Sequence, residues 1–177
     1  ADPAIRLGAV RLAGLWKVAK GVTPLAAIAA DPASSDEIRS AAFEALSAME
    51  RKDAIEPLTA SDRPVEVRLA AIAAAARLGI DGSADKAVGL LGQLKPGVSP
   101  THMIAAFLDR KDGADKLTAA IEKGKPSADA AKLALRSVYE LGRTDAVLVA
   151  ALTKAAGLSN EVKPPTKEEI DALIAEV

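Results

Sequence analysis

The chain contains no cysteine, which excludes disulfide bonds, thiolate metal sites, a cysteine nucleophile and covalent haem attachment within its 177 residues. It has a single histidine, His102, whereas a metal site needs several ligands. Thr101 and Asp109 are the nearest polar candidates, but Asp109 lies seven positions away, two turns along the same helix face and too far for a direct pair. The sequence therefore predicts no catalytic residue, no metal and no cofactor, and a surface or packing role for His102.

Aromatic residues make up only 2% of the chain, and 23 basic residues nearly balance 24 acidic ones, for a net charge of −1. Nucleic-acid binding needs a basic surface and, for single strands, aromatic side chains on which bases stack. The composition therefore predicts no nucleic-acid partner. No run of about 18 apolar residues is present, which predicts no membrane span in this chain.

Alanine, in contrast, is abundant, with 40 residues. It has the highest helix propensity and allows helices to approach closely. With it comes a recurring pattern of a turn, a branched apolar residue, a basic residue, and then alanine and leucine at helical spacing. The pattern recurs every 29 to 34 residues, at Ile5-Arg6, Ile38-Arg39, Val67-Arg68 and, in weaker form, His102-Met103 and Ala131-Lys132. A period near thirty that holds two helices predicts an all-α fold, an α-α superhelix of about five stacked hairpins.

Helix breakers and apolar spacing place the individual helices. The inner helices are expected near 4–17, 35–49, 65–78, 101–110 and 127–141, and the outer helices near 21–30, 53–60, 84–94, 114–123 and 145–156. Ser34 and Glu37 fit a capping box at the start of the second inner helix.

The helical array is assigned to residues 1–157. A polar linker over 158–165 and a last helix over 166–177 follow, and this helix either caps the array or leads to a further domain. The chain lacks an initiator methionine and begins inside a repeat. We therefore expect a fragment of a larger protein, and its compartment is left open.

These residues resemble the HEAT repeat family, in particular its short bacterial form, in which a turn aspartate precedes a valine-arginine pair on the inner helix. The matching sets are Asp62, Val67 and Arg68, then Asp31, Ile38 and Arg39, and Asp2, Ile5 and Arg6. Pro24 and Pro57 match the proline that the family often carries in its outer helix, whereas His102 and Lys132 depart from the pattern by replacing arginine. The resemblance covers about residues 2–157 and implies a scaffold rather than a particular activity.

The stretch from Val162 to Val177 is similar to the segment before a c-type haem domain in large exported proteins of planctomycete and verrucomicrobial bacteria. That resemblance implies an accessory module that positions a haem or dehydrogenase domain for electron transfer, in the periplasm or outside the cell. No Cys-x-x-Cys-His is present, so no haem chemistry is implied for this chain. A weaker alternative is a HEAT-type lyase that acts on bilin-bearing proteins, although no catalytic residue is marked. The main prediction is a non-catalytic scaffold, cytoplasmic if the haem-protein resemblance does not hold, that binds another protein or another domain of its own chain.

The basic residues have two interpretations. Arg6, Arg39 and Arg68 either bond to turn aspartates and to carbonyl groups of neighbouring repeats, or form a basic stripe that holds an acidic partner. Trp16 either anchors a partner or covers the end of the array. The residues expected on a partner-binding concave face are Arg39, Arg68, His102, Lys132, Arg136 and Tyr139, of which the last three share one helix face.

Overall fold

The computed structural model describes residues 2–158 of the chain. This part consists of ten α-helices and two short 3₁₀ helices and contains no strand, which confirms the predicted all-α class. The elements are α1 (Pro3–Leu15), η1 (Ala19–Gly21), α2 (Val22–Ala30), α3 (Asp36–Ala48), α4 (Lys52–Ile55), η2 (Glu56–Thr59), α5 (Val65–Arg77), α6 (Ser83–Leu91), α7 (Thr101–Leu108), α8 (Gly113–Gly124), α9 (Ala128–Glu140) and α10 (Ala146–Ala155).

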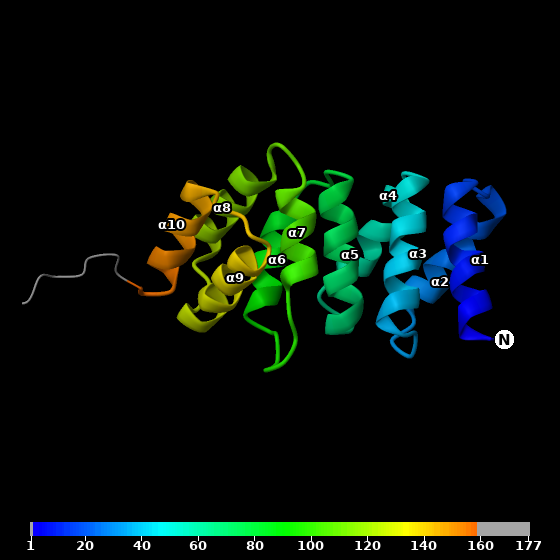
Figure 1. Cartoon of the computed structure of the whole chain (residues 1–177), viewed down its shortest axis with the longest axis horizontal. Coiled ribbons are helices and arrows are strands. Elements are labelled where there is room, and N and C mark those ends of the chain that lie inside the picture. Colours follow the sequence, from blue (N-terminus) through cyan, green and yellow to red (C-terminus); the bar gives the residue numbers. More distant parts are fainter. Residues whose placement is uncertain (1, 159–177) are drawn as a thin grey trace, which may run out of the picture.

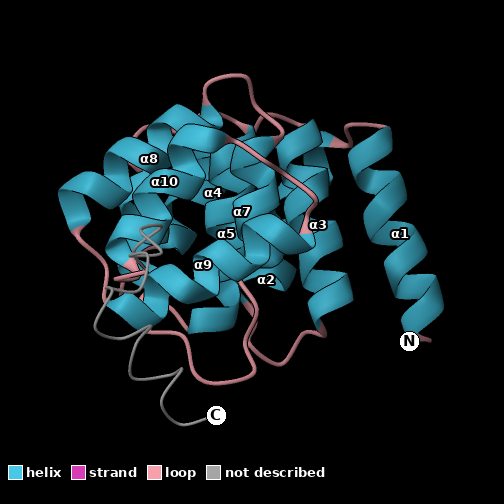
Figure 2. Ribbon diagram, turned by 60° about the vertical axis from the view of Figure 1, so that its left-hand side comes forward, coloured by secondary structure: helices cyan, strands magenta, loops and turns pink. Residues whose placement is uncertain are grey.

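The helices follow one another along the long axis of the molecule, with α1 at one end (Figure 1). We call the first helix of each hairpin an inner helix: α1, α3, α5, α7 and α9. Each inner helix packs against the next one, α1 on α3, α3 on α5, α5 on α7 and α7 on α9. The later outer helices pack in the same serial way, α6 on α8 and α8 on α10. Figure 2 shows α1 at one edge of the molecule.

A residue with a positive φ, in the left-handed backbone conformation, follows several of the inner helices. After α5, Gly79 has a φ of +65°, the N–H of Gly79 donates to the carbonyl of Ala76, and the N–H of Ile80 donates to the carbonyl of Ala75. This pair of bonds is the Schellman motif, which satisfies carbonyl groups at a helix end and turns the chain back. Lys17 and Glu50, with φ values of 49° and 56°, take this left-handed conformation after α1 and α3 without being glycine.

Small residues set the spacing between the inner helices. Gly14 of α1 is buried against α3, and a Cβ added to it would lie 2.6 Å from both Cα and Cβ of Ala45. Ordinary carbon contacts are about 3.5–4.0 Å, so the two backbones approach as closely as their atoms allow. In α5, the alanines from Ala73 to Ala76 are all buried. Alanine at these positions is therefore a packing requirement as well as a helix former.

The buried apolar residues form two clusters, and α5 contributes to both. One cluster holds residues of α1 to α5 and includes Ala74, and the other holds residues of α5 to α10 and includes Ala73. Of the described helices, only α5 supplies buried residues to both clusters. Helix α5 is therefore the packing link between the two ends of the chain.

Two predictions differ from the structure, one on an outer helix and one on a helix cap, and a third concerns residues that the structure does not describe. The outer helix expected over 53–60 is split into α4 and η2, because Pro57 has no N–H to continue the α-helical bonding. The capping box at Ser34 is wrong: Ser35 is the N-cap of α3, and its Oγ accepts from the N–H of Ile38 at 3.4 Å. The predicted helix over 166–177 and, apart from Leu158, the predicted linker lie outside the described residues.

The close approach at Gly14 predicts opposite effects for two glycines of the same helix. Gly14→Ala is expected to destabilise the fold by about 1–3 kcal/mol, because its methyl group overpacks the contact with Ala45. Gly8→Ala is the control, since nothing lies within 4 Å of its added Cβ, and it is expected to stabilise by roughly 0.5–1 kcal/mol through helix propensity. Urea unfolding followed by circular dichroism measures both. Equal shifts of the same sign would contradict the tight α1–α3 contact.

Candidate functional site

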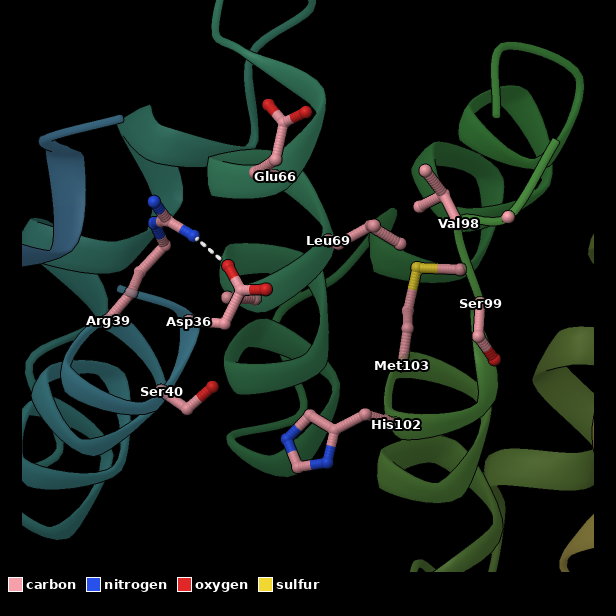
Figure 3. A pocket seen from close by; sticks show the side chains of 11 residues that line it. Asp36, Arg39, Ser40, Glu66, Leu69, Val98, Ser99, His102 and Met103 are labelled. Carbon is pink, nitrogen blue, oxygen red and sulfur yellow. Dashed lines mark hydrogen bonds and ion pairs between the residues drawn. The ribbon is translucent and has the colours of Figure 1, made fainter. Parts of the chain in front are cut away.

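A groove of about 410 Å³ crosses the amino-terminal turns of three successive inner helices, α3, α5 and α7 (Figure 3). The connection between α6 and α7 closes one side of it through Gly97, Val98 and Ser99. The apolar lining residues are buried or half-buried, namely Leu69, Ala70, Val98 and Met103. The exposed polar lining residues are Asp36, Glu66, Ser99 and His102. The groove therefore has an apolar interior and a polar edge, and three hairpins build it together.

Arg39 lines the groove but uses its guanidinium inside the protein. Its side chain is only 3% exposed, and Nη1 donates to the Asp36 carboxylate at 2.6 Å. Nη2 donates to the carbonyl of Ser34 at 2.6 Å and to the carbonyls of Pro32 and Asp31 at 3.0 and 3.4 Å. The turn before α3 is thus closed around the arginine. These bonds are of the kind expected for a structural role, and their acceptors lie in the connection between α2 and α3 and at the start of α3.

Arg77 of α5 favours the neutral form of His102. Its Nε2 lies 3.1 Å from Nη2 of Arg77. A guanidinium only donates hydrogen bonds, so Nε2 accepts, the ring proton is on Nδ1, and the ring is neutral. Partial burial of the ring lowers the pKa of His102 below its ordinary value of 6.5, and the charge of Arg77 lowers it further, whereas Glu44 and Asp109 raise it.

The other predicted partner-binding residues lie elsewhere. Arg68 is buried and donates to Oε1 of Gln93 at 2.7 Å, so it does not bond to the turn aspartate Asp62. Lys132, Arg136 and Tyr139 line a separate, shallow depression on α9. Tyr139 is 57% exposed there, and Arg136 donates to Glu140 at 2.8 Å. The structure thus brings Arg39 and His102 together in the groove and keeps the α9 residues apart from them.

At the amino-terminal end, Arg6 and Trp16 of the first hairpin are exposed. The Trp16 side chain follows directly after α1 and is 69% exposed. Ile5, Leu12 and Leu15 of α1 are exposed as well, so one face of this helix is apolar and open to solvent. This face lies apart from the groove.

Sequence reasoning missed an arginine series that links neighbouring hairpins. Arg77, Arg110 and Arg143 are spaced by 33 residues, and this regular spacing was the signal that could have revealed them. Arg110 donates to the carbonyl of Arg77 at 2.9 Å, and Arg143 donates to Asp109 at 2.9 Å. The Arg110 guanidinium lies over Gly79, where an added Cβ would be 2.9 Å from Nη2. The contacts of Arg110 and Arg143 fix how far each hairpin is offset from the preceding one.

Two further observations concern the described residues 2–158. No cluster of three or more histidine or carboxylate side chains in them is arranged to hold a metal ion. None of their helices has the length and apolar character that crossing a membrane requires.

Arg39 offers a test of its structural role. Arg39→Ala is expected to destabilise the chain by about 1–3 kcal/mol, because it leaves turn carbonyls and a buried site without their donor. Arg63→Ala is the control, because Arg63 is exposed in the turn before α5. It is expected to change stability by less than about 0.5 kcal/mol. Thermal unfolding measures both. If Arg39→Ala were as stable as the wild type, its guanidinium would be available to a partner after all.

His102 gives a pH prediction with a defined sign. Its imidazole should titrate below 6.5 in ¹H NMR, Arg77→Gln should raise this pKa, and Glu44→Gln should lower it. Because the unfolded chain takes up the proton first, stability should fall as the pH drops from 6.5 toward the folded pKa and then level off. The single histidine makes the signal unambiguous. An increase of the pKa in Glu44→Gln would contradict this electrostatic arrangement.

Comparison with known proteins gives no match: no protein-family model matches the chain, and neither does any curated protein or solved structure. The groove and its contacts therefore carry the functional interpretation.

Proposed function

We propose that the hairpins form a HEAT-like solenoid, and that the chain is a non-catalytic scaffold that binds a segment of another protein, or of another domain of its own chain, in the groove over α3, α5 and α7. The observation that carries this proposal is the groove itself, which three consecutive hairpins build and which combines an apolar interior with a polar edge. Stacked helical repeats expose extended surfaces of this kind for binding.

Three features support a stacked array. Each inner helix packs on its successor, and the later outer helices do the same. Gly14 provides the closest approach at the first contact. Arg110 and Arg143, 33 residues apart, each reach the preceding hairpin from the turn that follows an inner helix. In repeat proteins, contacts between neighbouring units supply most of the stability.

The chemistry of the groove favours binding over catalysis. A general base needs a free lone pair within reach of a nucleophile. The Nε2 lone pair of His102 is occupied by Arg77. The hydroxyl of Ser99 bonds to Thr101 at 2.7 Å, not to the histidine. Leu69 and Val98 instead offer an apolar surface of the type that anchors a partner side chain.

A displayed library of random peptides tests the proposal. The full chain is the target, and two variants that block the groove, Leu69→Arg and Ser40→Arg, are used for counter-selection. Val147→Arg is the control, because Val147 is exposed on α10, far along the chain from the groove. We expect enriched peptides to bind the wild type and the Val147→Arg variant and to lose binding to both blocked variants. Circular dichroism checks that all variants are folded.

Two outcomes would overturn the proposal. One is that no peptide depends on the groove. The other is that Val147→Arg weakens binding as much as the blocked variants do.

A further inference from the structure

We infer that the bound segment is cationic: it places a lysine or arginine side chain in the groove, with the stem on Leu69 and Val98 and the charged end beside Glu66 and Asp36. This inference rests on the proposed function and adds the chemical class of the partner. Three observations support it: the exposed charges of the groove are negative, the arginine in its lining is buried and already bonded, and its interior is apolar.

The charges that the groove exposes are negative. The Asp36 side chain is 92% exposed, and Glu66 is exposed on the next inner helix. Among the described residues, Glu66 forms no ion pair. The Asp36 carboxylate has one arginine partner, which approaches it from inside the protein. Both carboxylates therefore keep oxygens that face solvent and are available to a cation.

The one full positive charge in the lining is hidden. The Arg39 side chain is 3% exposed and already donates to one carboxylate and three carbonyl groups. His102 accepts a hydrogen bond from Arg77, which favours its neutral form. An anion that enters the groove would thus meet two exposed carboxylates and no exposed lysine or arginine among the lining residues.

Helix ends do not reverse this preference. The groove lies at the amino-terminal turns of α3 and α5, where the helix dipole favours negative charge. The acidic first-turn residues of these two helices are Asp36, Glu37 and Glu66, so the position that favours an anion is already taken by the protein's own carboxylates. A second anion beside them would be repelled, whereas a cation is attracted by both side chains.

The apolar interior suits a long side chain with a charged tip. Leu69 and Val98 are half-buried, and Met103 is buried beneath the groove. In Figure 3, Leu69 and Met103 lie to the right of Asp36 and Glu66, and His102 lies below them. Lysine and arginine pack their methylene stems on apolar surface while the charged head stays near water. Burial of the stem and the attraction of the head thus favour the same occupant.

Three blocked pentapeptides test the inference. They share the frame alanine-leucine-X-leucine-alanine and carry lysine, norleucine or glutamate at X. Binding is followed on the full chain by the ¹³C methyl signal of Met103, and Met49, the only other methionine, lies outside the groove as an internal control. We expect the lysine peptide to shift Met103 and not Met49, and to bind about five- to ten-fold more tightly than the glutamate peptide.

Matched variants test whether Glu66 is the carboxylate that binds the lysine of the peptide. Glu66→Gln should weaken the lysine peptide by about two- to five-fold and leave the norleucine peptide unchanged. Glu56→Gln, an exposed glutamate outside the groove, should change neither. The preference for lysine should also shrink as salt is added.

The outcomes separate this inference from the proposed function. If the norleucine or glutamate peptide binds as tightly as the lysine peptide and shifts Met103, the groove binds peptides but the cationic preference is wrong. If none of the three peptides moves the Met103 signal, both the inference and the assignment of the groove as a peptide site are overturned. A Glu66→Gln variant with unchanged lysine preference would reject the role of Glu66.

Discussion

Close approach of the inner helices is the constraint on which the rest of the structure depends. At Gly14 and Ala45 the backbones of α1 and α3 are separated by little more than their own atoms, and α5 carries four consecutive buried alanines. Each such residue buries little area, so stability comes from many short contacts rather than from large side chains. Both phenylalanines, Phe43 and Phe107, are buried, whereas the single tryptophan and tyrosine are exposed.

The groove lies where a long connection crosses the inner helices. The connection from α6 to α7 is the longest between the described helices, and Pro96, Gly97 and Pro100 keep it from continuing either helix. It carries Val98 and Ser99 over the amino-terminal turns of α5 and α7. The hairpin contacts below it stay regular, because Arg110 and Arg143 hold the stagger at the opposite ends of the inner helices. A long connection that crosses serially packed helices is therefore what creates the groove.

The helices were predictable because their signals are local. Apolar spacing and breakers such as Gly79 act within a few residues, and most predicted boundaries fall close to the observed ones. The choice between Ser34 and Ser35 as the cap of α3 depends on one residue of backbone geometry, which the sequence pattern does not resolve. The groove depends on side chains from three hairpins brought together by packing. Its members Glu66 and Val98 carry no sequence signature, so only the three-dimensional arrangement reveals them.

The position of α5 between the two apolar clusters has a consequence for folding cooperativity. The side chains of the groove come from α3, which belongs to the first cluster, from α7, which belongs to the second, and from α5 between them. Anything held in the groove touches both halves of the molecule and stabilises only the state in which both are folded. Occupancy would thus join two blocks, otherwise connected through one alanine-rich helix, into a single unfolding unit.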